Sequence, residues 1–239
     1  MNAALIARWL PAEQLERVLK TDLFDEAVAE GLYQLLATRA RCVEAIDVSP
    51  VVLSLASRKY PKMHTFAADV RNLSCESDSI DAVVSLSTLD HFDAPGDIAA
   101  ALCELHRVLK PGGTLILTLD NSANPIVAIR NLLPYKLTHG VGLAPYPAGF
   151  TYRPGRLHRA VESAGFAIGE STTILHAPRV LAIPALNALD RRGPIAMQAF
   201  ALRALMAFET LAMLPTRKTT GHFVALRATK KLESGAQRV

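Results

Sequence analysis

The regular alternation of strand-like and helix-like segments over the first half of the chain constrains its fold most. Short apolar stretches of strand character recur between stretches of helical periodicity, and turn residues separate them. Strands are predicted at 17–21, 42–48, 63–68, 81–87 and 114–120. Consecutive parallel strands need a crossover connection, which a helix usually supplies. Five strand–helix units in this rhythm therefore predict a parallel, doubly wound α/β sheet with right-handed crossovers.

The helices between these strands carry recognisable signals. Helices are predicted over 25–38, where apolar residues recur on one face, and over about 95–109. The helix predicted at 50–59 begins with Pro50, and Ser49 before it is a favoured N-cap residue.

The alternation breaks after Asn121. An irregular lid-like insertion at 122–151, a helix at 153–166, a strand at 167–175, a mainly helical stretch at 178–216 and a last strand at 221–230 follow. A chain of 239 residues with 50% hydrophobic content can bury one full core. We therefore expect a single domain over 1–239, with lid-like insertions at 122–151 and 178–216.

The charge of the chain argues against a nucleic-acid partner. The formal net charge is +4, but lysines and arginines are scattered, and the only basic cluster is the C-terminal tail at 227–239. Binding of a polyanion needs a basic face or stripe. We expect no nucleic-acid partner.

The cysteines and the N-terminus favour a cytoplasmic location. Cys42, Cys75 and Cys103 are odd in number and widely spaced, which fits a reducing compartment and not a disulfide framework or a metal site. Cys42 and Cys103 lie in apolar patterns, so buried thiols are predicted there. The N-terminus turns polar too early for a secretory signal, and little chain precedes the first strand to form a cap domain.

Three carboxylates fall at or near the ends of the first three predicted strands. Asp22 follows the first strand, Asp47 closes the second and Asp69 follows the third. In a doubly wound sheet, ligands bind at the carboxyl ends of the strands. A carboxylate at the end of the second strand can accept two ribose hydroxyls, and one after the third can reach an adenine amine. The alternatives are a turn acid before a helix for Asp47 and an ordinary loop acid for Asp69.

Three stretches of the sequence resemble the class I S-adenosylmethionine-dependent methyltransferases, in particular their small-molecule branch. They are "AIDVSP" (45–50), "AADVRNLSCESDSIDAVVSLSTLDHF" (67–92) and "ELHRVLKPGGTLILTLD" (104–120), whose "KPGG" (110–113) is a turn. The resemblance covers about 17–121 and the last strand. It implies a Rossmann-like, mainly parallel seven-stranded sheet with helices on both faces, an antiparallel last strand and helical insertions near the C-terminus. It also implies S-adenosylmethionine as the cofactor.

The resemblance further implies cofactor contacts at the ends of the second, third and fourth strands. These are Asp47 and Val48 at the ribose, Asp69 and the Val70 backbone at the adenine, and Ser85, Leu86 and Ser87 near the methionine end and the sulfonium.

The first motif departs from the family pattern. An acid followed by a glycine-rich turn is replaced by "KTDLFDEA" (20–27). Without glycines the backbone approaches a ligand less closely. Asp22, Asp25 and Glu26 are expected either to cap the helix at 25–38 or to hold the α-ammonium group of the cofactor. The first N–H groups of that helix are the candidate site for the methionine carboxylate.

Methyl transfer to a hydroxyl needs alignment and a base. His91, after the fourth strand, is the candidate base, although a loop histidine without a catalytic role fits the same pattern. Asp90 is expected to cap the following helix or to support the site. In the first insertion, four residues either line an acceptor pocket or pack the lid: Tyr135, His139, Tyr146 and Tyr152. No run like "NPPY" follows the fourth strand, which disfavours a base amine as acceptor.

The segment 195–214 is apolar over more than one helical face. Arg203 and Glu209 disfavour a membrane span. One side is expected to pack on the sheet, and the other to meet a partner in a homodimer, an apolar acceptor or a membrane surface. The sequence therefore predicts methyl transfer to oxygen or nitrogen of a small, partly apolar acceptor. The alternative is a catalytically inactive scaffold that uses these apolar helices.

Overall fold

The computed structural model describes residues 2–140, 149–178 and 195–232. They form one seven-stranded sheet in the order β3-β2-β1-β4-β5-β7-β6. The strands are β1 (Leu15–Lys20), β2 (Ala40–Asp47), β3 (His64–Ala67), β4 (Ile80–Leu86), β5 (Leu109–Asp120), β6 (Phe166–Ile174) and β7 (Phe223–Lys230). The first five strands pair in parallel, whereas β7 lies antiparallel between β5 and β6. The predicted fold class is confirmed.

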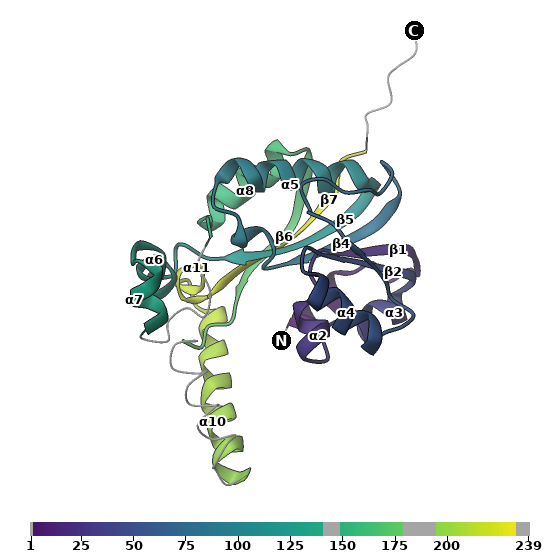
Figure 1. Cartoon of the computed structure of the whole chain (residues 1–239). Coiled ribbons are helices and arrows are strands. Elements are labelled where there is room, and N and C mark those ends of the chain that lie inside the picture. The colour runs from purple at the N-terminus through teal and green to yellow at the C-terminus, as the bar shows by residue number, and fades with distance from the viewer. Residues whose placement is uncertain (1, 141–148, 179–194, 233–239) are drawn as a thin grey trace.

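Helices cover both faces of this sheet (Figure 1). The α-helices of the described residues are α1 (Asn2–Trp9), α2 (Phe24–Val28), α3 (Tyr33–Arg39), α4 (Pro50–Lys59), α5 (Pro95–Val108), α6 (Pro125–Leu132), α7 (Tyr135–Gly140), α8 (Pro154–Ser163), α10 (Ile195–Ala207) and α11 (Arg217–Thr220). Two short 3₁₀ helices, η1 (Leu89–His91) and η2 (Phe208–Met213), complete the set. One core cluster lies under α5 and α8, and the other under α1, α3 and α4. Successive residues of a central strand enter opposite clusters, as the pleat requires: Val83 faces the first cluster and Val84 the second.

The helix predicted over 25–38 is two helices, so the expectation of one continuous helix is wrong. α2 ends at Val28, and Gly31 then adopts a φ of 62° before α3 begins at Tyr33. A carboxylate oxygen of Glu26 accepts the backbone N–H of Leu32 at 2.8 Å, which stabilises the break. Lys59, the last residue of α4, and Tyr60 after it donate side-chain hydrogen bonds to backbone carbonyls between residues 26 and 30.

The predicted N-cap at Ser49 is confirmed, since its hydroxyl accepts the backbone N–H of Val52. The predicted turn at 110–113 lies within β5, which begins at Leu109 and shifts register against β4 before Thr114. Gly112 allows this irregularity because its φ is 78°.

The expectation that Cys42 and Cys103 are buried is wrong. Cys103 is exposed because it lies outside the stripe of α5 that packs on the sheet, and Cys42 is half-buried beside Glu44. Among the three, Cys75 is the buried thiol.

The two insertions are partly described. The first contains α6, capped by Asn124, and α7, whereas Tyr146 lies outside the described residues. In the second, α10 projects away from the sheet (Figure 1). None of the side chains described in α10 is buried, so the expected packing of one side on the sheet is wrong. No helix among the described residues is long and apolar enough to cross a membrane.

Candidate cofactor and acceptor site

A buried ion-pair cluster occupies the position at which the family pattern has a glycine-rich turn. Lys20, the last residue of β1, is 1% exposed. Its ammonium lies 2.8 Å from a carboxylate oxygen of Glu26 and 3.2 Å from one of Asp22. Burial by itself would lower the pKa of Lys20, but the two carboxylates outweigh that effect and raise it. The lysine is therefore charged, and two acids face one cation.

Glu26 holds the loop together. Its carboxylate is fully buried between Lys20 and the backbone N–H of Leu32. A Cβ atom added at Gly31 would lie 2.6 Å from that carboxyl group, so Glu26 fills the space beside this glycine. Glu26 is thus committed to internal contacts.

Asp22 is the second acid of this loop that contacts Lys20, and its side chain is 23% exposed. Burial raises the pKa of its carboxyl group, although Lys20 opposes that shift. Its Oδ2 is buried with no hydrogen-bond partner among the described residues, besides the ion-pair contact to Lys20. The predicted capping role is wrong for Asp22, because the N-cap of α2 is Leu23 and no side chain caps that helix. Asp25 is exposed in the first turn.

Asp47 links the ends of β1 and β2. Its Oδ2 accepts the N–H of Leu23 at 3.0 Å and its Oδ1 accepts that of Ser49 at 2.8 Å. Each carboxylate oxygen can accept a second hydrogen bond, so the half-buried Asp47 can also receive both hydroxyls of a diol. The turn role and the ligand role are compatible here.

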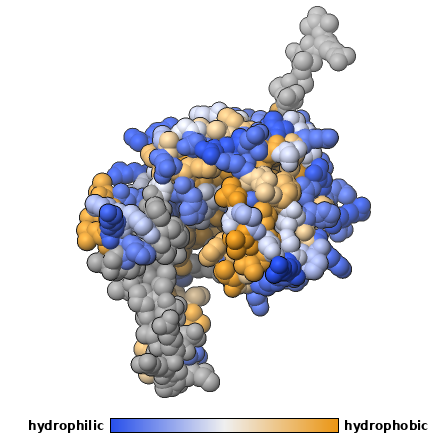
Figure 2. All heavy atoms as spheres, in the orientation of Figure 1, coloured by the Kyte–Doolittle hydropathy of each residue, from blue (hydrophilic) through white to orange (hydrophobic). Residues whose placement is uncertain are grey.

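An apolar patch borders Asp47. Phe24, Val48 and Val51 are 59%, 73% and 67% exposed. Phe24 lies on α2, Val51 on α4 and Val48 in the loop before α4; Figure 2 shows hydrophobic surface in this region. Exposed apolar side chains gathered beside polar groups are typical of a ligand surface.

The side chain of Asp69 is hydrogen-bonded to Arg71, two residues further along the chain. Its two oxygens accept hydrogen bonds from the guanidinium group and the backbone N–H of Arg71, which also contacts Asp97. The Arg71 hydrogen bonds lower the pKa of Asp69. Val70, the next residue, is buried. The loop-acid alternative thus has direct structural support, and an adenine amine would share Asp69 with Arg71.

The turn after β4 meets the end of β1. The hydroxyl of Thr21 donates to that of the buried Ser85 at 2.9 Å and lies 2.8 Å from the hydroxyl of Thr88. Ser87 has a φ of 52°, which is unusual for a residue other than glycine. Leu86, between the two serines, is half-buried. The predicted methionine-end segment therefore adjoins the Lys20–Asp22 loop.

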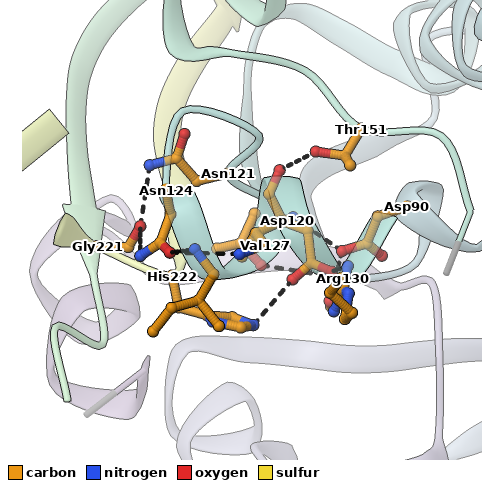
Figure 3. Close-up of polar contacts among 12 residues, drawn as sticks. Asp90, Asp120, Asn121, Asn124, Val127, Arg130, Thr151, Gly221 and His222 are labelled. Carbon is orange, nitrogen blue, oxygen red and sulfur yellow. Dashed lines mark hydrogen bonds and ion pairs between the residues drawn. The ribbon is translucent and has the colours of Figure 1, made fainter. Parts of the chain in front are cut away.

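A second polar cluster lies at the carboxyl ends of β4 and β5 (Figure 3). Asp90 accepts hydrogen bonds from the Ser87 hydroxyl at 2.7 Å and from the N–H of Asp120 at 2.9 Å. Asp120 in turn contacts Arg130 at 2.5 Å and His222 at 3.4 Å. The predicted helix-capping role of Asp90 is wrong, because Ala94 precedes α5 and no side chain caps it.

The two aspartates of this cluster titrate differently. Burial and the nearby charge of Asp120 raise the pKa of Asp90 to about 6. Burial would also raise the pKa of Asp120, but His222 and Arg130 outweigh it and lower that pKa. The Oδ1 atom of Asp90 is buried and has no hydrogen-bond partner among the described residues.

Residues 149–152 lie against the turn that carries His91. A Cβ atom at Gly149 would clash with the backbone of residues 90–92, and the N–H of Phe150 donates to Phe92. His91 itself is exposed in η1. Tyr152 is half-buried, and its backbone forms an isolated parallel β-bridge with Asn121.

The described residues of the first insertion form a small contact of their own. Tyr135 and His139 lie one helical turn apart on α7, with their rings 5.3 Å apart. Their side chains pack on each other, as the lid-packing alternative predicts.

Comparisons with known proteins agree with this geometry. A solved S-adenosylmethionine-dependent methyltransferase structure from Methanosarcina mazei has a TM-score of 0.64 at 16% identity, over 96% of this chain and 98% of that one, so the fold is shared. The family model described as "Methyltransferase domain" matches residues 27–117. Residues 27–117 thus match a methyltransferase domain, and the fold is that of the class I S-adenosylmethionine-dependent methyltransferase superfamily. The family match begins at the last residue of the altered first motif.

Two curated relatives match parts of the chain. A demethylmenaquinone methyltransferase of Chlorobaculum tepidum is 31% identical over 105 residues, which are 42% of this chain and 41% of that protein. A probable S-adenosylmethionine-dependent methyltransferase of Mycolicibacterium smegmatis is 23% identical over 156 residues, or 65% of this chain and 55% of that protein. The chain thus spans about half the length of the curated relatives it matches.

The cofactor of this superfamily is S-adenosylmethionine, and the residues at the strand ends fit it. Asp22 Oδ2 lies 3.2 Å from the Lys20 ammonium and can accept a further ammonium contact, and Asp47 offers two oxygens to a ribose diol. The exposed apolar side chains beside Asp47 suit a planar base. The altered first motif places charged side chains, Lys20, Asp22 and Glu26, where the family pattern has a glycine-rich turn.

Proposed function

We propose that this chain transfers a methyl group from S-adenosylmethionine to an oxygen or nitrogen atom of a small, partly apolar acceptor. The observation that carries the proposal is the position of Asp47. It closes β2, is held by the N–H groups of Leu23 and Ser49, and keeps acceptor capacity on both oxygens. A rigid carboxylate at this strand end is the ribose contact of a doubly wound nucleotide-binding fold.

The loop after β1 holds the methionine end through charge in place of glycine backbone. Lys20 is shared by Glu26 at 2.8 Å and Asp22 at 3.2 Å, so the loop carries one more acid than base and Asp22 can accept a second cation. An α-ammonium group at this position would stabilise the ionised form of Asp22 and offset the burial that raises its pKa.

The cofactor supplies an activated methyl group on a sulfonium, and the remaining work is alignment and proton removal. Ser87 and Asp90 fix the turn after β4 against the end of β5. His91, exposed on this turn, is the proposed proton acceptor for an acceptor hydroxyl or ammonium group. The segment at 149–152 closes over the same turn and limits access of water.

The test is calorimetric titration with S-adenosylhomocysteine, which needs no knowledge of the acceptor. Wild-type protein is expected to bind it with a Kd in the micromolar range, about −8 kcal/mol. Asp47→Asn keeps the shape but loses the charge-assisted hydrogen bonds to the diol, so about tenfold or more weaker binding is expected. Glu76→Gln, at an exposed acid in the loop before β4, is the control and should bind as the wild type does.

Absence of binding by the wild type at millimolar ligand would contradict the proposal and favour the inactive scaffold.

We also propose a cytoplasmic location and a homodimer formed through 178–216, or else contact of that segment with a membrane surface. The exposed apolar residues Phe200, Leu202 and Met206 of α10 support such a contact. Sedimentation equilibrium and liposome co-sedimentation distinguish these two uses.

A further inference from the structure

Two hollows open at the first turn of α8, on the side of the sheet edge formed by β6. One has a volume of about 430 Å³ and the other about 380 Å³. The larger is lined by Ala123, Pro154, Gly155, His158, Ser171, Thr172, Thr173, Arg217 and Lys218. The smaller is lined by Ser122, Thr151, Arg153 and Arg156. Residues of 122–123 and of 153–158 contribute in turn to one hollow and to the other, so the two hollows adjoin each other.

Cations line these hollows and acids do not. Arg153, Arg156, Arg217 and Lys218 are all exposed, and none forms an ion pair with a described residue. No aspartate or glutamate is among the lining residues of either hollow. Like charges gathered without a counter-charge repel one another, and a bound anion removes that cost.

Hydroxyl and backbone donors complete the lining. Ser122 contributes a hydroxyl to the smaller hollow, whereas the Thr151 hydroxyl there donates to the carbonyl of Asp120; Ser171, in contact with His158 at 2.8 Å, contributes to the larger. In the first turn of α8, Pro154 has no N–H and the N–H of Arg156 donates to the carbonyl of Arg153, so the backbone donor without a side-chain cap is that of Gly155, where a Cβ atom would meet nothing within 4 Å. This mixture of guanidinium, hydroxyl and N–H donors matches the oxygens of a phosphoryl group.

The hollows lie beside the acceptor end of the proposed active site. Ser122 follows β5 by two residues, and the Thr151 hydroxyl donates to the backbone carbonyl of Asp120. Asp120 belongs to the cluster that holds Asp90 and the turn of His91. A ligand with one end in the smaller hollow thus has its other end on the side where the methyl group is transferred.

We propose that the Arg153–Arg156 hollow and its neighbour bind a phosphate or diphosphate group of the methyl acceptor. That the ligand is a methyl acceptor rests on the proposed function, whereas the anion site itself does not depend on it. The acceptor is then amphiphilic, with a phosphorylated end held at α8 and an apolar end toward the exposed apolar side chains of the insertions.

The experiment is calorimetric titration of the full chain with inorganic pyrophosphate at constant ionic strength, with benzoate as a carboxylate probe. Wild-type protein is expected to bind pyrophosphate with a Kd below about 1 mM and to bind benzoate much more weakly. Arg153→Gln combined with Arg156→Gln should weaken pyrophosphate binding about tenfold or more, since two charge-assisted contacts are lost. Arg159→Gln, at an exposed arginine of α8 outside both hollows, should leave it unchanged.

Three results would overturn the inference: no pyrophosphate binding by the wild type, equal weakening by Arg159→Gln, or stronger binding of benzoate than of pyrophosphate. Titration with S-adenosylhomocysteine in parallel separates the two proposals. Retained cofactor binding in the double variant, with pyrophosphate binding lost, supports a distinct anion site. A wild type that binds pyrophosphate but not S-adenosylhomocysteine contradicts the proposed function and leaves the anion site intact.

Discussion

Replacement of Lys20 by methionine tests whether the first motif is held together by charge. A methionine side chain has nearly the volume of lysine but no ammonium group, so Glu26 stays fully buried without its counter-ion. Breaking a buried ion pair by removing one partner costs about 3–5 kcal/mol, because an uncompensated charge remains inside the protein. We expect a loss of that size in the free energy of unfolding at neutral pH.

The double variant Lys20→Met/Glu26→Gln should recover most of this loss. Glutamine keeps an amide oxygen that can accept the N–H of Leu32, as Glu26 does at 2.8 Å. Neutral replacement of both partners is often nearly free of cost, so we expect stability within about 1–2 kcal/mol of the wild type.

The assay is urea unfolding followed by the fluorescence of Trp9, the single tryptophan, which is buried and donates to Glu170. Lys62→Met, at an exposed lysine, is the control and should change stability by less than about 0.5 kcal/mol. A loss below about 1 kcal/mol for Lys20→Met, or a double variant as unstable as the single one, would refute a structural role for this ion pair.

Two further predictions concern stability. The folded protein keeps the Asp90 proton up to about pH 6, whereas the unfolded chain loses it near 3.8, so the free energy of unfolding should fall by up to about 3 kcal/mol as the pH rises through this window. Urea titrations at several pH values check this, and Asp90→Asn should flatten the profile; an unchanged profile in the variant would assign the effect elsewhere. Gly31→Ala should lower stability by about 1–3 kcal/mol, because alanine disfavours the φ of 62° and its Cβ meets Glu26. Thermal melts of Gly31→Ala and of the control Gly155→Ala, where an added Cβ meets nothing within 4 Å, check this. Equal melting temperatures of the two variants would contradict the reasoning.

The sheet was predictable because its signals are local. Each strand is a short apolar run next to a turn, and Ser49 and Pro50 mark a helix start within two residues. The break between α2 and α3 was missed, although Gly31 stood inside the predicted helix. It depends on the hydrogen bond from Leu32 to Glu26 and on contacts with α4, neither of which periodicity reports.

The candidate site, too, could be predicted from the sequence only in part. Asp47 was predictable because topology alone brings the strand ends together. The pairing of Lys20 with Glu26 was not, since the sequence pattern does not distinguish a cofactor-binding acid from one that neutralises a buried lysine. The Asp120–His222 contact joins residues about a hundred positions apart. The sequence signal that could have pointed to this contact is Asp120, the aspartate that closes the fifth strand.

The most direct test of the central claim is a crystal structure with S-adenosylhomocysteine bound. We predict both ribose hydroxyls within hydrogen-bond distance of Asp47, and the α-ammonium group facing Asp22 with the Lys20–Glu26 pair unbroken. A ligand bound away from Asp47, or a methionine end that displaces Lys20 from Glu26, would contradict the account.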